Sequence, residues 1–177
     1  MAVPAFDPQG MADEAFGQKD ANRDGTLSAD ELKDWPGVRA AFGAMDKNKD
    51  GKVDQAEFEE HIAGYAVGKI GMQSLTCFVT ANGKPVSGLT VDFTPEPMFA
   101  AYAKAGRAMT GSDGSGAVLP TGGGLPGMAP GMYRVSISKR EGEREMLPAK
   151  YNVKSELGFE VSNAGGGAPA RFDIAPR

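Results

Sequence analysis

The sequence predicts a two-domain protein in which an all-α part is followed by an all-β part. Apolar residues up to residue 63 recur at the 3.6-residue spacing of helices, whereas later apolar runs are short and alternate as strands do. Charge divides at the same place: 14 Asp and Glu stand against 7 Lys and Arg in the first part, and 9 against 12 in the second. Of the 25 glycines, 6 lie in the first part. We expect domains over residues 1–63 and 73–177, joined by a linker over 64–72.

Composition excludes several classes of protein. A net charge of −4 gives no basic surface for nucleic acid, and no apolar run approaches the roughly 18–20 residues that cross a bilayer. The first residues lack the basic end and the apolar centre of a signal peptide. The single Cys excludes an internal disulfide and a thiolate zinc cluster. We therefore expect neither nucleic-acid binding nor membrane insertion.

A segment of 12 residues occurs twice in the first part. DANRDGTLSADE at residues 20–31 aligns without a gap with DKNKDGKVDQAE at residues 46–57. Both copies fit the pattern D-x-[DN]-x-[DN]-G-x5-E of EF-hand calcium loops. The first part therefore resembles a tandem EF-hand pair, which implies four short helices and two calcium loops.

The residue types in each loop suit calcium. This ion takes six to eight oxygen ligands, and the loop offers them from side chains at positions 1, 3, 5, 9 and 12 and from the backbone carbonyl at position 7. The predicted ligands of the two ions are Asp20, Asn22, Asp24, Thr26, Ser28 and Glu31 in the first loop, and Asp46, Asn48, Asp50, Lys52, Asp54 and Glu57 in the second. The second loop has four carboxylates against three in the first, so we predict that it is the stronger site.

Apolar residues around the loops predict how the pair packs. Leu27 and Val53 stand at loop position 8, where paired EF-hand loops form a short backbone bridge. Phe16 and Phe42 each lie four residues before the first ligand. Further apolar residues at helical spacing complete the predicted core of this part: Leu32, Trp35, Met45, Phe58 and Ile62.

The spacing of the loops leaves two roles for calcium open. The loops start 26 residues apart, and Pro36 with Gly37 breaks the helix between them, so the helices there are expected to be short. Such a pair resembles bacterial secreted EF-hand pairs more than eukaryotic sensors, and it has little helix with which to open a target groove. Calcium either holds the fold together or changes its shape.

The second part predicts an all-β sandwich. SLTCFVTANGKPVSGLTVDFTPE, which begins at Ser74, places two alternating runs on either side of Asn82-Gly83, a strong signal for a tight hairpin turn. Further short apolar runs between glycine and proline turns are GAVLPT, PGMYRVSISK, LGFEVS and ARFDIA.

Residues 74–174 also resemble a known family. GKPVSGLTVDFTP, the D-x-x-G turn at 113–116, P-G-x-Y-x-V at 130–135 and L-P-x-K-Y at 147–151 are similar to carboxypeptidase-regulatory-like, transthyretin-like modules of planctomycete and other bacterial exported proteins. The resemblance implies an accessory Ig-like sandwich without catalytic residues and an extracytoplasmic location. Residues 98–127 are expected to form a long loop, which offers a surface for a protein partner.

No catalytic set is visible in the sequence. His61 is the only histidine, and we expect it to be exposed or to have a packing role; Cys77 is expected to be a buried small hydrophobe. We predict a non-enzymatic calcium-binding protein whose sandwich serves in structure, adhesion or protein interaction. The alternative is a calcium-responsive regulator whose EF-hand pair exposes a partner-binding surface. A pocket of convergent titratable groups in the sandwich would instead favour an enzyme.

Overall fold

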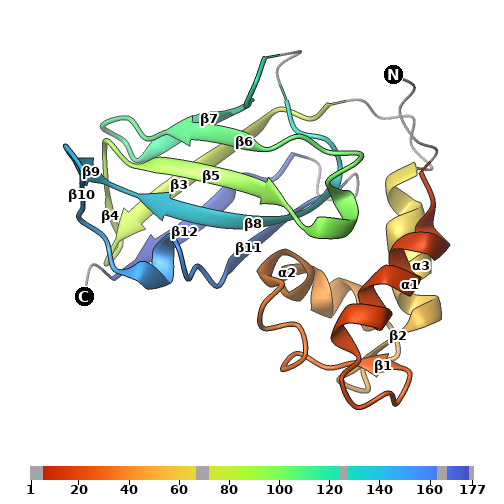
Figure 1. Ribbon diagram of the computed structural model, residues 1–177. Coiled ribbons are helices and arrows are strands. Elements are labelled where there is room, and N and C mark those ends of the chain that lie inside the picture. Colours follow the sequence, from red (N-terminus) through yellow and green to blue (C-terminus); the bar gives the residue numbers. More distant parts are fainter. Residues whose placement is uncertain (1–5, 67–71, 124–126, 163–166, 176–177) are drawn as a thin grey trace.

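The computed structural model describes residues 6–66, 72–123, 127–162 and 167–175, in which helices precede a large β-sheet (Figure 1). The helical part contains α1 (Pro8–Lys19), β1 (Thr26–Leu27), α2 (Pro36–Met45), β2 (Val53–Asp54) and α3 (Gln55–Ala66). The large sheet contains β3 (Leu75–Ala81), β4 (Lys84–Pro85), β5 (Thr90–Pro95), β6 (Gly106–Met109), β7 (Ser115–Pro120), β8 (Gly131–Ser138), β11 (Leu157–Val161) and β12 (Ala170–Ile174). Shorter elements are η1 (Pro97–Phe99), β9 (Arg140–Glu141), β10 (Arg144–Glu145) and η2 (Ala149–Tyr151). No helix in these residues has the length and apolar character that a membrane span requires.

The expectation of four helices is wrong, because the described residues contain three. The missing helix would have followed the first loop, where residues 29–34 form turns instead. Pro36 explains this difference, since a residue before proline is pushed out of the helical region. Trp35 accordingly has φ −120° and ψ 72°, and Pro36 becomes the first residue of α2.

The β part is one strongly curved sheet with the strand order β11-β8-β5-β6-β7-β3-β12. Its neighbouring strands are antiparallel, except that β12 runs parallel to β3. Strand β7 changes partner along its length: Val118 pairs with Leu75 of β3, whereas Leu119 pairs with Arg107 of β6. The sheet therefore folds over at β7 into a half-barrel, with β3 and β12 behind β5 and β8 in Figure 1.

The strands expected from alternation form. The turn between β3 and β4 has φ 50° at Asn82 and φ 76° at Gly83, the left-handed pair that an Asn-Gly hairpin requires. The expected long loop over 98–127 is wrong in its described residues: it contains the end of η1, strand β6 and strand β7. Sequence alternation is weak there because small residues such as Gly106 and Ala108 occupy the buried positions of β6.

Aromatic rings fill the space inside the curved sheet. Phe93 of β5 is fully buried, and its ring centroid lies 6.2 Å from that of Phe159 and 6.3 Å from that of Phe172. Phe159 belongs to β11 and Phe172 belongs to β12, the two outer strands of the sheet. The central ring thus joins two strands that share no backbone hydrogen bonds.

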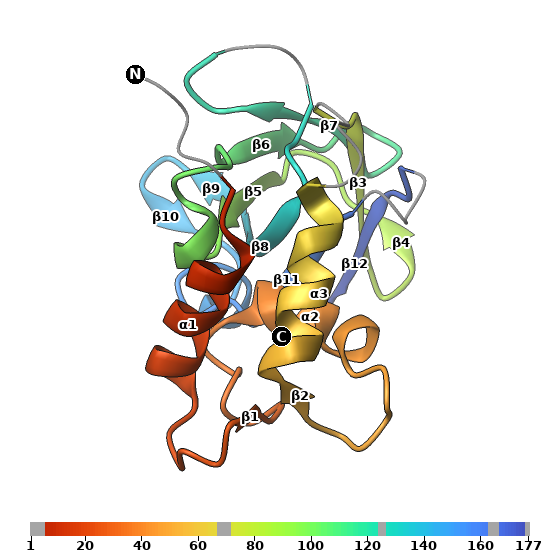
Figure 2. The same cartoon turned by 90° about the vertical axis from the view of Figure 1, so that its right-hand side faces the viewer.

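Helix α2 packs directly on the sheet, against β8 and β11 (Figure 2). Two glycines permit this contact. A Cβ atom on Gly158 of β11 would lie 1.8 Å from the carbonyl oxygen of Pro36, and a Cβ atom on Gly37 would lie 2.7 Å from the backbone nitrogen of Tyr133 on β8. The helix therefore approaches the strands backbone to backbone, and one hydrophobic core runs through both parts.

The boundary between the two parts differs from the expected linker at one end. Helix α3 continues to Ala66, so the first three residues of the expected linker are helical. Residues 67–71 lie outside the described part of the chain, and the described residues resume at Met72.

The packing of α2 on β11 predicts the effect of a single methyl group. Gly158→Ala should lower the free energy of unfolding by about 1–3 kcal/mol, because a well-packed contact cannot absorb the added atom without displacing the helix. Gly43→Ala is the matched control: it lies in α2 with nothing near its Cβ position, and alanine favours a helix by about 0.5–1 kcal/mol over glycine. Urea unfolding of both variants measures the difference; equal stability would contradict the close contact.

Candidate functional site

The two repeated loops have the same backbone shape. Gly25 and Gly51, at loop position 6, have φ 78° and 83°, and Arg23 and Lys49, at position 4, have φ 58° and 60°. Left-handed values are uncommon outside glycine, and here they recur at the same two positions of both copies. The repeat in the sequence is therefore a repeat in structure.

The first aspartate of each loop organises the turn around it. Asp20 accepts hydrogen bonds from the backbone nitrogens of Asp24 (3.1 Å) and Gly25 (2.9 Å). Asp46 accepts the equivalent bonds from Asp50 (3.1 Å) and Gly51 (3.0 Å). Both carboxylates thus curl the chain toward themselves.

The glutamates at position 12 close the loops. Glu31 accepts hydrogen bonds from the backbone nitrogens of Ala21 (3.1 Å) and Ser28 (2.9 Å), and from the Ser28 hydroxyl (2.7 Å). The bonds from Ser28 hold the pKa of Glu31 below its usual value, so this carboxylate is charged at neutral pH. Glu57 accepts hydrogen bonds from the backbone nitrogens of Lys47 (3.0 Å) and Asp54 (3.1 Å). Glu57 is 8% exposed, so it is more deeply buried than Glu31.

A short backbone bridge joins the loops, as the sequence predicts. Leu27 of β1 pairs with Val53 of β2, and Thr26 pairs with Asp54. Leu27 and Val53 are both fully buried. The ring centroids of Phe16 and Phe58, which flank the loops in the sequence, lie 5.9 Å apart in an edge-to-face contact.

The apolar residues predicted to form the core of this part lie in it. Fully buried or nearly so are Leu32, Trp35, Met45, Phe58 and Ile62, and Phe16 and Phe42 pack against them. The two loops are therefore held at a fixed separation by a common core.

One ion pair links the two loops. The Lys52 ammonium lies 2.8 Å from Oδ2 of Asp24, which also accepts from Asn22. The pKa of Asp24 lies far below its usual value, and the largest cause is the hydrogen bond from the Lys52 side chain. The same pair raises the pKa of Lys52. Asp24 and Lys52 are therefore charged across the physiological range.

The donors in the loops fit a hard cation. Carboxylate, amide, hydroxyl and carbonyl oxygens are the ligands that calcium takes, and the twelve predicted ligand positions supply these types alone. Across the described residues, no group of three or more His, Cys, Asp or Glu side chains gathers closely enough to hold a metal by itself. A calcium ion here would therefore need the Asn22 or Asn48 amide oxygen and the carbonyl oxygen of Thr26 or Lys52 as well as carboxylates.

A comparison with protein families supports the assignment of the two repeated loops. Residues 11–34 and 38–62 match the family model described as EF hand, and each range contains one complete loop. The match supports calcium binding by the helical part of the chain. Comparisons with curated proteins and with solved structures found no match.

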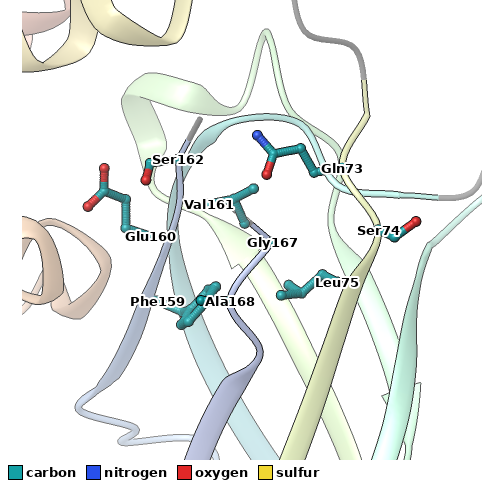
Figure 3. A pocket seen from close by; sticks show the side chains of 9 residues that line it. All are labelled: Gln73, Ser74, Leu75, Phe159, Glu160, Val161, Ser162, Gly167 and Ala168. Atoms are coloured by element: carbon teal, nitrogen blue, oxygen red, sulfur yellow. The ribbon is translucent and has the colours of Figure 1, made fainter. Parts of the chain in front are cut away.

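A surface cavity of about 520 Å³ in the β part is lined by polar and charged side chains, among them Asp92, Arg140 and Glu145. A smaller cavity, between the ends of β11 and β12, has a volume of about 40 Å³, room for one or a few waters. Figure 3 shows Leu75 and Val161 beside it, with Glu160 directed to the other side of β11. Cys77 is fully buried, as expected, and burial raises the pKa of its thiol.

His61 has a specific partner that sequence reasoning missed. Its Nε2 lies 2.8 Å from Oε1 of Glu160, and the Tyr65 hydroxyl donates to the same oxygen at 2.8 Å. His61 and Tyr65 stand four residues apart on α3 and so share a face. That spacing in the sequence predicts a shared helix face for His61 and Tyr65, but no sequence feature near Glu160 identifies it as their partner.

The closing glutamates test which loop binds calcium more tightly. Glu57→Gln should weaken the tighter phase of a calorimetric calcium titration by about tenfold or more, because it removes one of four carboxylates from the stronger loop. Glu31→Gln is the matched variant and should weaken only the looser phase. Loss of the tighter phase in Glu31→Gln, with that phase intact in Glu57→Gln, would reverse the predicted order. Circular dichroism in chelator checks that both variants fold.

Proposed function

We propose that this chain is a non-enzymatic calcium-binding protein that binds two ions, one in each loop. In this proposal calcium stiffens an EF-hand pair that is already fixed to an accessory β-sandwich, and the sandwich serves in structure, adhesion or protein interaction. The observation that carries the proposal is the attachment of both helices of the second EF-hand to the sheet. A pair held in this way is suited to stability more than to a calcium-driven opening.

The first attachment lies at the start of α2. The carboxylate of Glu96, 2% exposed, accepts a hydrogen bond of 2.8 Å from the backbone nitrogen of Gly37. Burial raises the pKa of Glu96, and the Gly37 N–H partly offsets this cost. Because the first N–H groups of a helix lack partners inside it, Glu96 fixes both the position and the direction of α2.

The second attachment lies along α3. Tyr65 and His61 both bind Glu160 of β11, and the Tyr65 ring meets that of Phe99 at a centroid distance of 5.8 Å. Tyr65 is 8% exposed, and its burial beside Glu160 raises its pKa well above the usual value, so the hydroxyl keeps its proton. Both helices around the second loop thus contact β11.

Opening the second EF-hand would carry a cost at each of these places. A change of angle between α2 and α3 would separate Gly37 from Glu96 or Tyr65 from Glu160. Either loss leaves a buried polar group without its partner, which costs about 1–3 kcal/mol. This cost favours the structural role of calcium over the alternative of a regulator that exposes a new surface.

Features of the β part support the proposed transthyretin-like identity. Its antiparallel strands close with β12 parallel to β3, and the hairpin at Asn82-Gly83 stands where the resemblance places it. Across the described residues, the single histidine is engaged with Glu160 and the single cysteine is buried. A non-enzymatic accessory module accounts for these features.

The partner and the location belong to the same proposal. Met109 and Leu119, on neighbouring strands within residues 98–127, are 71% and 55% exposed, and they support a protein partner for the β part. An extracytoplasmic, bacterial setting supplies the calcium that weak, permanently filled loops need. Sequencing of the complete gene tests the location: an export signal is expected, and its absence would refute this part of the proposal.

Calcium should raise thermal stability without exposing apolar surface. At about 100 times the dissociation constant, each ion adds about 2.7 kcal/mol, equivalent to about 5–10 °C in thermal midpoint for a chain of this size. Calorimetry in calcium and in chelator measures this shift, and binding of a hydrophobic dye reports exposed apolar surface. A small shift with a calcium-dependent rise in dye binding would instead support the regulator.

A further inference from the structure

The two loops treat their position 5 aspartates differently. Asp24 and Asp50 each accept a bond of 2.9 Å from the backbone nitrogen two residues later, and each accepts from the Asn two residues earlier, at 3.2 and 3.0 Å. Up to this point the two environments match. Asp24 has two further contacts, with the Thr26 hydroxyl at 2.6 Å and the Lys52 ammonium at 2.8 Å.

The bridge between the loops explains why Lys52 reaches Asp24. The register pairs Leu27 with Val53, which brings position 7 of the second loop beside the first loop. Lys52 is long enough to cross to Asp24 from there. The matching residue of the first loop is Thr26, whose short neutral side chain binds Asp24 within its own loop. The ion pair therefore runs in one direction.

We propose that Lys52 is a tethered cation that competes with calcium for Asp24, so that the first loop is the weaker site and fills second. This inference rests on the proposed function, because it concerns the same two loops. It adds a cause that the count of carboxylates does not contain: a ligand of the first loop has a positive partner supplied by the second.

Charge decides the direction of the effect. An ammonium 2.8 Å from a carboxylate neutralises part of the field that attracts a divalent ion, and it repels that ion directly. The pair is exposed to solvent, because the Lys52 and Asp24 side chains are 48% and 35% exposed, so solvent screening makes the effect moderate. The predicted ligand that Lys52 supplies to the second loop is its backbone carbonyl, and a side-chain substitution leaves that oxygen in place.

Lys52→Gln tests the inference, with Lys49→Gln as the matched control. Both remove one positive charge from the second loop, and Lys49 is exposed with no contact to Asp24 in the described structure. Lys52→Arg keeps the cation. The amide resonances of Gly25 and Gly51, which bond to Asp20 and Asp46, report each loop separately during a calcium titration followed by NMR.

In the wild type, Gly51 should respond to calcium before Gly25. Lys52→Gln should tighten calcium binding at the first loop about three- to tenfold. The difference in calcium affinity between the two loops should therefore become smaller, whereas Lys52→Arg should keep the wild-type order of filling. Lys49→Gln should change the first loop less than about twofold. Unchanged spectra outside the loops establish that the variants fold.

Two results would overturn the inference: equal effects of Lys52→Gln and Lys49→Gln at the first loop, or a wild type in which the first loop already fills first. Both leave calcium binding itself intact. Absence of any response at Gly25 and Gly51 in the wild type would refute the proposed function together with the inference, so the two failures are distinct.

Discussion

The close approach of α2 to the sheet is the contact on which the arrangement of the chain depends. Gly37 and Gly158 remove the side chains that would separate the helix from β8 and β11, and Glu96 then binds the free N–H at the start of the helix. The helix that precedes the second loop is thereby part of the core of the β part. We propose that a loop whose supports are buried in this way binds an ion without a large change of shape.

Features that depend on local backbone chemistry were predictable from the sequence. The two loops, their glycine turns and the Asn82-Gly83 hairpin each follow from residues within a few positions of one another. The bridge follows from Leu27 and Val53 standing at the same position of the two repeated loops. Gly25 and Gly51 are required by the left-handed backbone at loop position 6. The backbone geometry of the two loops was therefore predictable from the sequence.

Features that depend on residues far apart in the chain were not predictable. The attachment of His61 and Tyr65 to Glu160 joins positions separated by 99 and 95 residues, and no periodic pattern encodes such a pair.

The absence of a fourth helix from the described residues was predictable in principle, because Pro36 restricts the residue before it. Strand β6 was missed because its buried positions are glycine and alanine, which give a weak alternation signal.

The central claim is that calcium stiffens a junction that is already formed, and hydrogen exchange at the Gly37 amide tests it most directly. This N–H donates to Glu96 at the point where α2, the helix before the second loop, contacts the β part. Exchange should be slow in chelator and slower still in calcium, since binding to the folded state suppresses opening. Faster exchange in calcium would show that the ion separates α2 from the sheet, and it would contradict the account.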